Sequence, residues 1–593
     1  MTDRTAAVIS MAWAGALLAA LWQFVPAVWD DTDDLRMAMI AGGIGAPDGP
    51  DSILLYMHVI IGSILSRLYT ALPVVPWYTW MLIGIHLLSV ACLSFTALAA
   101  GLRTVALSAC AVLQIAVTCY FWTHLQFTTS AAVLALAGLS LLTLGLSRTA
   151  DSNRTRLLIC GGLCLTGSSL IRLQSTQLVI ILSGICVLIT VWKFRPDFRP
   201  VKDSLILAVS ALLLLGGTIW QNSTYQATPE LASFHKDLIA YAPIVNSIYL
   251  VRPSQADPDA GGHPDEDRKL AELGLRWNDI RCMQWWYMID EDVFSSDNLA
   301  ALAQVFPVLG RVDFFISIVS RGLPGILLGN NLFLLFVGTG IGLLLSHEPS
   351  TRQTVLCLLL WGLAVVVMAV VLCAMKLPER VFIPAGMTCF MMTLLSCTIL
   401  REHRNQQDTE SGLPDKSVTM KTPARRPRGQ IWLSVMTLLA ACVAIEHVSF
   451  GKQLVRQRDG VEQTIEQLNH LEHDLHVVLV PFPFQLLDPL RTPELLRDWN
   501  FIYLDGHQRS PRQQKIIHAH LGQTLSEAVL ENPDIRFVVE PEARSLRYIQ
   551  TFYRSHYGLD VRFPIDRMLP WGSLRRLEQR PAHPNPDTDS NAG

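Results

Sequence analysis

Apolar runs of roughly one bilayer's length alternate with polar turns along the first three quarters of the chain. The first run, residues 6–28, contains no Asp, Glu, Lys or Arg, and about 20 apolar residues suffice for a helix to cross the hydrocarbon core. Ten further runs follow, so we expect eleven membrane-spanning helices. The others lie at about residues 77–100, 105–120, 127–146, 157–171, 178–192, 205–220, 323–345, 355–374, 381–400 and 431–448.

Basic residues predict the orientation of these spans. The turns at 148–156, 193–202 and 401–428 are rich in Lys and Arg, and such turns lie on the cytoplasmic side of a membrane. Eleven spans with a cytoplasmic N-terminus satisfy this rule. The segments at 29–75 and 221–322 then lie outside, and we call them the first outer loop and the long outer loop.

The first outer loop is itself partly apolar. Its stretch from Ser52 to Leu72 is interrupted by His58 and Arg67, so we expect a helix that lies along the membrane surface and does not cross it.

The pattern changes at about residue 451. Short apolar runs alternate with amphipathic ones, which predicts a small α/β domain outside the membrane at 451–580, and the tail at 581–593 is expected to be disordered. The expected strands are His476–Phe482, Asn500–Leu504, Ile535–Val539 and Val561–Pro564; the expected helices are Thr492–Arg497, Pro511–Val529 and Arg544–Tyr557.

Composition agrees with a membrane protein. Hydrophobic residues make up 51% of the chain and charged residues 16%, against about 25% in soluble domains. Mean hydropathy is +0.33. The net charge of −3 shows no basic excess, so nucleic acid is not an expected partner.

Four carboxylates follow the first span within five positions: Asp30, Asp31, Asp33 and Asp34. Carboxylates this close repel one another, so one or more should have a raised pKa unless a cation or metal ion offsets the charge. Such a group can take a proton from a sugar hydroxyl near neutral pH. A solvated acidic loop is the alternative interpretation.

The run from Thr32 to Gly42, which contains Asp33, Asp34 and Arg36, resembles the Asp-Asp or Asp-Glu motif of the GT-C superfamily of polyprenyl-phosphate-sugar-dependent glycosyltransferases. The Gly-rich loop, Leu68-Tyr69 and Trp77-Tyr78 that follow resemble an under-characterised bacterial branch of that superfamily. The resemblance implies a catalytic transmembrane region at 1–450, in the bacterial cytoplasmic (inner) membrane, with the C-terminal domain on the periplasmic side.

The resemblance also implies a reaction. Asp33 would be the general base that deprotonates an acceptor hydroxyl, and Asp34 would assist in acceptor or metal binding. A monosaccharide would pass with inversion from a polyprenyl-phosphate carrier to a glycan or lipid acceptor. Where superfamily members often carry a second acidic residue, between spans three and four, this chain has His124. The sequence therefore predicts no particular cofactor. Binding of a divalent metal, Mg²⁺ or Mn²⁺, is the alternative, and His124 in place of an acidic residue argues against it.

A phosphate leaving group calls for cations at the level of the lipid head groups. Arg172 ends the fifth expected span, and Lys376 and Arg380 flank Pro378 after the ninth, all on the expected outer side. Arg and Lys both suit phosphate, so we expect these three to bind the donor. The alternative is that they are snorkelling anchors.

Further substrate-binding candidates combine aromatic rings with charged groups, as sugar recognition does. They are Asp31, Arg36, His124, Trp277, Asp279, Trp285, Trp286 and Asp290. For those in the long outer loop, an interfacial aromatic belt is the alternative.

Two other functions fit the same features. A transporter or flippase of lipid-linked sugars would bind its substrate without turnover, but its charges should lie at mid-membrane, whereas here they lie at helix ends. A polysaccharide polymerase or ligase also uses outer arginines and a long outer loop, and the acidic first loop argues against it.

Overall fold

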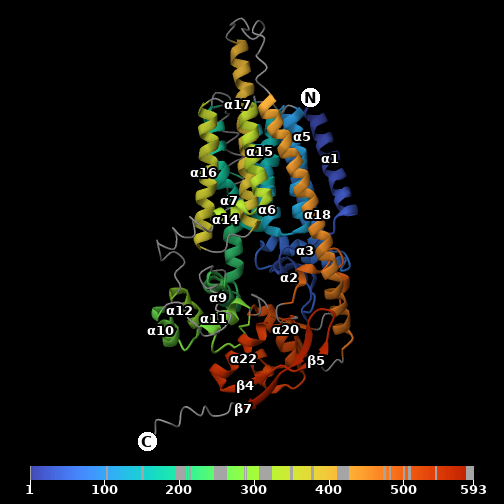
Figure 1. Cartoon of the computed structure of the whole chain (residues 1–593), viewed down its shortest axis with the longest axis vertical. Coiled ribbons are helices and arrows are strands. Elements are labelled where there is room, and N and C mark those ends of the chain that lie inside the picture. Colours follow the sequence, from blue (N-terminus) through green and yellow to red (C-terminus); the bar gives the residue numbers. More distant parts are fainter. Residues whose placement is uncertain are drawn as a thin grey trace.

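The computed structural model shows a helix bundle with an α/β domain at one end (Figure 1). It describes residues 2–101, 104–148, 152–193, 209, 212, 216–245, 264–285, 287–288, 290–305, 323–347, 351–374, 379–410, 427–471, 476–479, 482–497, 501–504, 509–540, 542 and 544–581.

Long apolar helices form the bundle. They are α1 (Asp3–Phe24), α4 (Trp77–Ala99), α5 (Thr104–Thr123), α6 (Phe127–Leu146), α7 (Ser152–Lys193), α15 (Asn331–His347), α16 (Thr351–Ala374), α17 (Glu379–Glu410) and α18 (Pro427–Asn469), with the short α14 (Leu323–Leu328) beside them.

Among the described residues, five helices are long and apolar enough to cross a membrane, and several apolar helices are shorter. This is compatible with a membrane protein, but the expected count of eleven spans is not confirmed. Predicted spans five and six form the single element α7, and predicted span seven lies largely outside the described residues.

Helix α7 bends where the sequence placed a turn. Arg172 is non-helical, with φ −155° and ψ 101°, so the hydrogen-bond ladder is interrupted there. The carbonyl of Leu170 instead accepts a hydrogen bond from the backbone N–H of His58 at 2.8 Å. The first outer loop therefore satisfies a backbone group that the kink leaves open.

Two short helices of the first outer loop lie directly below the bundle in Figure 1. Helix α2 (Thr32–Gly42) begins at Asp31, whose side chain caps the N–H of Thr32, and ends at Gly43 with φ 73°. Helix α3 (Val59–Ala71) has 13 residues, about 20 Å, which is too short to cross the roughly 30 Å hydrocarbon core.

The C-terminal domain has a five-stranded sheet in the order β2-β1-β3-β6-β5. Strands β2, β1 and β3 pair in parallel, and β6 pairs antiparallel with both β3 and β5. A separate pair, β4 and β7, is antiparallel. The strands are β1 (His476–Leu479), β2 (Phe501–Tyr503), β3 (Ile535–Val539), β4 (Leu559–Arg562), β5 (Ile565–Met568), β6 (Ser573–Arg576) and β7 (Glu578–Pro581).

The sheet's helices are α19 (Thr492–Leu495), α20 (Pro511–Leu521), α21 (Leu525–Glu531) and α22 (Arg544–Tyr557), with the 3₁₀ turn η4 (Phe484–Leu486). The small α/β domain is thus present. The expectation of one helix over Pro511–Val529 was wrong, because Gly522, with φ 70°, ends α20 in a left-handed cap. The expected disordered tail at 581–593 lies, except for its first residue, outside the described residues.

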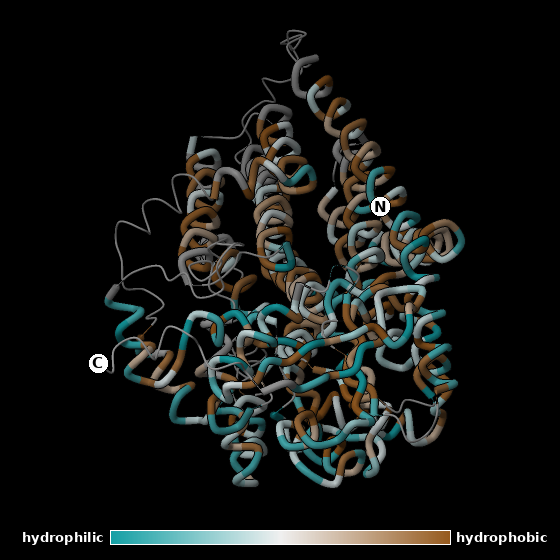
Figure 2. The backbone as a smooth tube through the Cα atoms, turned by 60° about the horizontal axis from the view of Figure 1, so that its bottom comes forward, coloured by the Kyte–Doolittle hydropathy of each residue, from teal (hydrophilic) through white to brown (hydrophobic). Residues whose placement is uncertain are grey.

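The long outer loop packs on this domain through α9 (Pro229–Val245), α10 (Pro264–Glu272), α11 (Trp277–Gln284) and α12 (Ser296–Val305). Their apolar residues share one core with those of the sheet and α22. Helix α18 runs on from the bundle to Asn469, across the expected boundary at 450. Figure 2 shows hydrophobic positions dominating the bundle and hydrophilic ones gathering at the domain end.

Candidate functional site

The four carboxylates lie at the junction of α1 and α2. Asp30 and Asp31 lie between the two helices, and Asp33 and Asp34 lie in the first turn of α2. The chain between these helices pairs with the turn that joins α5 to α6: Leu125 donates to the carbonyl of Val28 at 2.8 Å, and the N–H of Asp30 donates to Leu125 at 3.1 Å. These backbone hydrogen bonds fix the start of α2, where Asp31 is the N-cap and Asp33 lies in the first turn. Both side chains are half-buried.

The predicted phosphate-binding Arg380 reaches this acidic cluster. Its guanidinium donates to Asp31 at 2.7 Å, from the first turn of α17, 349 positions away in the chain. Asp30 and Asp33 also lie within electrostatic reach of Arg380. The sequence placed these groups on one side of a membrane, and the structure brings them into contact.

Arg172 reaches the same place from the kink of α7. Its guanidinium lies 5.0 Å from the ring centre of Tyr56 and 5.4 Å from that of Phe127, and the two rings stack on each other 5.8 Å apart. Asp33 and Arg380 lie within electrostatic reach of it. Asp30, Asp31 and Asp33 therefore form one charged cluster with Arg172 and Arg380, which we call the acidic–arginine cluster.

Asp34 faces the other way, into the protein. It is fully buried, and its Oδ1 accepts hydrogen bonds from the Tyr78 hydroxyl at 2.8 Å and the Phe127 N–H at 2.9 Å. The N–H of Tyr78 in turn donates to the Tyr69 hydroxyl at 3.1 Å. Asp34 therefore ties α2 to α3, α4 and α6, and the tyrosines that carried the family resemblance belong to this same chain of contacts.

Burial shifts the titration of these carboxylates. Burial raises the pKa of Asp30 to about 7, with Arg380 lowering it and Asp31 and Glu379 raising it. Burial and the neighbouring Asp33 raise the pKa of Asp31, against Arg380. Burial holds the pKa of Asp34 well above its usual range, despite its two donors. The pKa values of these carboxylates are raised, as the sequence predicts, but burial is the larger cause and repulsion between neighbouring carboxylates the smaller one.

His124 lies beside the cluster in the turn between α5 and α6. It stacks between the rings of Tyr120 and Phe450, at 4.5 Å and 5.5 Å, and its Nδ1 donates to the carbonyl of Tyr120 at 3.0 Å. Burial lowers its pKa. A neutral, stacked imidazole of this kind packs the turn. Within the described ranges, no group of three or more His, Cys, Asp or Glu side chains has the arrangement of a metal site.

Arg36 is buried and directed to the C-terminal domain. Its guanidinium donates to the side-chain carbonyl of Gln513 in α20, 477 positions away. This contact joins α2 to the domain.

The candidates of the long outer loop lie elsewhere, against α22. Asp279 caps α11 by accepting from the N–H of Arg276 at 2.7 Å and contacts His556 at 2.9 Å. Trp285 stacks on Tyr548 at 6.3 Å.

Two further candidates of that loop hold it in shape. Trp277 donates to Asp267 at 2.5 Å, and Asp290 accepts from the N–H groups of Asp292 and Val293 and from the hydroxyl of Tyr557. The structure does not bring these four residues to the acidic–arginine cluster. Trp286 and Lys376 lie outside the described residues.

A cleft of about 1390 Å³ opens between the first outer loop, α9 and α20. Leu55 forms part of one wall. The guanidinium of Arg172 lies over the ring of the next residue, Tyr56. Leu55 has a φ of 60°, rare for a leucine, and its carbonyl accepts from the Tyr225 hydroxyl at 2.9 Å. Sequence reasoning missed Leu55, Tyr56 and Tyr225, because no motif marks a strained turn.

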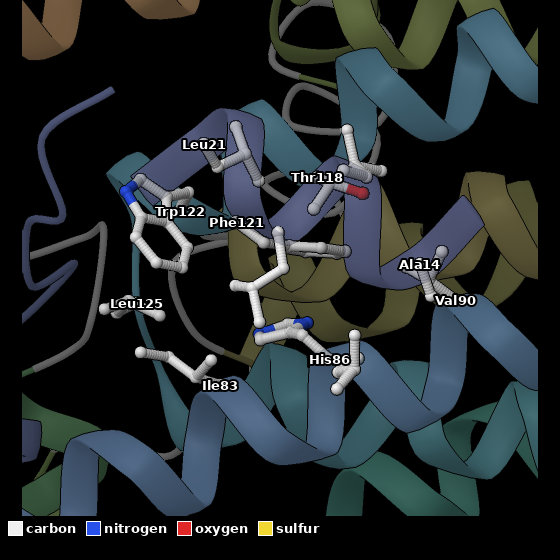
Figure 3. A pocket seen from close by; sticks show the side chains of 12 residues that line it. Ala14, Leu21, Ile83, His86, Val90, Thr118, Phe121, Trp122 and Leu125 are labelled. Carbon is white, nitrogen blue, oxygen red and sulfur yellow. The ribbon is translucent and has the colours of Figure 1, made fainter. Parts of the chain in front are cut away.

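A second, apolar pocket lies within the bundle between α1, α4 and α5 (Figure 3). Its volume of about 20 Å³ has room for little more than one water-sized group. His86 faces it beneath the ring of Phe121, with 5.0 Å between the ring centres, and its Nε2 lies 3.0 Å from the Ser130 hydroxyl. This pocket is a packing space of the bundle and offers no room for a substrate.

Comparison with known proteins gives no relative: no family model matches the chain, and no curated protein matches its sequence.

Proposed function

We propose that the protein is an inverting glycosyltransferase of the GT-C type that moves a monosaccharide from a polyprenyl-phosphate carrier to an acceptor. The observation that supports this is the acidic–arginine cluster: Arg380 contacts Asp31, and Arg172, from a helix far away in the chain, lies within electrostatic reach of Asp33. Bases for a hydroxyl and cations for a phosphate are the two parts that the reaction needs.

Asp33 is the proposed base, because it is half-buried, whereas Asp34 is fully enclosed. The acceptor O–H gives its proton to the Asp33 carboxylate as its oxygen bonds to the anomeric carbon. The bond between that carbon and the phosphate oxygen breaks, and its electron pair leaves with the lipid phosphate. Attack opposite the leaving group inverts the anomeric centre.

Arg172 and Arg380 are the proposed phosphate ligands, with Lys376 as a third. Contacts within the protein position both guanidinium groups. That of Arg172 lies over the rings of Tyr56 and Phe127, and that of Arg380 donates a hydrogen bond to Asp31. A guanidinium fixed in this way loses little conformational freedom when it binds phosphate. Asp34 is a positioning residue that fixes α2, and so Asp33, against Tyr78 and Phe127.

The proposed setting is the outer face of a bacterial cytoplasmic membrane, with the N-terminus inside. What supports a single reacting face is that the first outer loop, the long outer loop and the C-terminal domain gather at one end of the bundle (Figure 1). The charges at this end also favour an enzyme over a transporter, whose charges should line the middle of the bundle.

Proteoliposomes supplied with a panel of radiolabelled polyprenyl-phosphate sugars and a crude envelope acceptor test the phosphate ligands. Arg380→Ala should reduce transfer by about 100-fold, because the leaving phosphate loses a charged partner. Arg491→Ala, an exposed arginine of the C-terminal domain, is the matched control and should transfer at the wild-type rate. Equal transfer by the two variants would refute the assignment of Arg380.

A further inference from the structure

The cleft between the first outer loop, α9 and α20 has features of a ligand site that the proposed reaction has not yet used. Its volume of about 1390 Å³ exceeds the roughly 300–1,000 Å³ of pockets for a single small molecule. There is therefore room for several sugar rings in a row.

The charges on its walls are arranged in pairs. Lys515 contacts Asp48 at 2.7 Å, Arg512 contacts Asp51 at 3.6 Å, and Arg509 contacts Asp237 at 3.4 Å. The first two pairs join α20 to the first outer loop, and the third joins the segment just before α20 to α9. The basic side chains of the cleft are thus already matched by carboxylates and hold its walls together.

The balance of charge is negative. Besides the three paired carboxylates, Glu230 and Glu291 line the cleft, so five carboxylates face two arginines and one lysine, with His518 as a further lining residue. Hydroxyl groups can donate to these carboxylates, whereas an anionic ligand would meet like charge. The walls also carry Ser233, Ser296 and Ser510, which both donate and accept.

The cleft is also connected to the acidic–arginine cluster through neighbouring residues of the chain. Leu55 lines the cleft. The guanidinium of Arg172, which belongs to the acidic–arginine cluster, lies over the ring of the next residue, Tyr56. The hydrogen bond from Tyr225 holds the strained Leu55 in place between the two. A chain bound at the Leu55 end of the cleft would therefore lie one residue from Tyr56, over whose ring the Arg172 guanidinium lies.

We infer that this cleft is the acceptor site and that it takes an uncharged, hydroxyl-rich glycan of several sugar units, with one wall supplied by the C-terminal domain. The assignment of an acceptor rests on the proposed function. The recognition chemistry, a neutral glycan in preference to an anionic one, rests on the cleft alone.

The test measures binding without donor, on the full chain in nanodiscs, by isothermal titration calorimetry. The probes are three neutral tetrasaccharides (maltotetraose, cellotetraose and tetra-N-acetylchitotetraose) and the anionic tetragalacturonate. A neutral probe should bind, and tetragalacturonate should bind at least about tenfold more weakly. Preferred binding of tetragalacturonate, or no binding of any probe, would overturn the inference.

Two variants on one helix locate the binding. Ser233 and Lys236 are both exposed on α9, but only Ser233 lines the cleft. Ser233→Trp should weaken binding of the neutral probe at least about tenfold by filling the cleft, and Lys236→Trp should leave it unchanged. Equal binding by both variants would overturn the site.

This design keeps the two proposals apart. Neutral-glycan binding that Ser233→Trp abolishes, together with no sugar transfer from any donor, would refute the glycosyltransferase and keep the glycan site. Sugar transfer that Ser233→Trp leaves unchanged would refute the acceptor site and keep the enzyme.

Discussion

At the scale of single residues, two adjacent carboxylates have opposite surroundings. Asp33 is half-buried among the arginines of the acidic–arginine cluster, and Asp34 is fully buried under two hydrogen-bond donors. The family resemblance implied that Asp33 is the base and that Asp34 assists in acceptor or metal binding. The burial and hydrogen bonds of Asp34 favour a structural role for it instead, and Asp33 remains the proposed base.

Asp34→Ala should destabilise the protein. It leaves the Tyr78 hydroxyl and the Phe127 N–H buried without their acceptor, at about 1–3 kcal/mol each. Asp34→Asn keeps a carbonyl acceptor and should cost less, and Asp33→Asn should leave stability unchanged. Thermal unfolding in detergent checks this order. A larger loss in Asp33→Asn than in Asp34→Ala would contradict the division of roles.

Asp30 should make stability depend on pH. Its folded pKa is about 7, above the ordinary 3.8, so the protonated form fits the fold and its contribution is fully present below about pH 3.8. That contribution is lost as the pH rises through about 7. The melting temperature should therefore fall between about pH 4 and about pH 7, and Asp30→Asn should flatten the fall. An equally steep fall in Asp30→Asn would show that other groups cause it.

Residue contacts across the chain were the least predictable feature. That Arg172 and Arg380 share a side with the carboxylates followed from the order of spans and turns. That Arg36 turns to Gln513, or that Asp279 and Asp290 serve the packing on α22, depends on partners hundreds of positions away. No local pattern records such partners.

At the scale of elements, the close pairing of α6 and α7 depends on glycine. A side chain at Gly138 would lie 2.8 Å from the carbonyl oxygen of Gly161, and one at Gly161 would lie 2.7 Å from that of Gly138. Small residues allow this backbone approach, which membrane helices commonly use.

Gly138→Ala should therefore lower the free energy of unfolding by about 1–3 kcal/mol, because the helices must move apart. Gly84→Ala in α4 is the control, since no atom lies within 4 Å of a side chain there. Alanine has the higher helix propensity, so the control should lose no stability. Thermal unfolding of both variants in detergent gives the comparison, and equal melting temperatures would argue against tight α6–α7 packing.

Elements with strong periodicity were predictable, and exposed strands were not. The helices of the bundle and the buried strand β3 follow from apolar runs, whose burial dictates their pattern. Strand β5 is exposed throughout, so no alternation of buried and exposed positions marks it in the sequence. The break between α20 and α21 could have been read from Gly522, which a left-handed helix cap favours.

At the scale of the whole molecule, the C-terminal domain is fixed to the bundle near the site. Arg458 of α18 is buried and donates to the carbonyls of Leu486 at 2.9 Å and Ala27 at 2.5 Å, and contacts Asp488 at 3.2 Å. A single guanidinium thus joins a bundle helix, the domain and the segment that follows α1.

Arg458→Ala should loosen this junction, because two buried carbonyls lose their donor. Hydrogen exchange of the segment around η4 should become faster, while the bundle helix α6 keeps its protection. Arg554→Ala is the control, since that side chain is 64% exposed and its pair with Asp560, at 2.9 Å, lies away from η4 in the chain. Unchanged exchange around η4 in Arg458→Ala would contradict this role.

The central claim is that the acidic–arginine cluster transfers sugar with Asp33 as the base. The most direct measurement is transfer from a radiolabelled polyprenyl-phosphate sugar in proteoliposomes, comparing wild type and Asp33→Asn at equal expression and equal melting temperature. The account predicts new glycosidic product from the wild type and a loss of orders of magnitude in Asp33→Asn. Label that crosses the membrane without a new glycosidic bond, to the same extent in both proteins, would contradict it and favour a transporter.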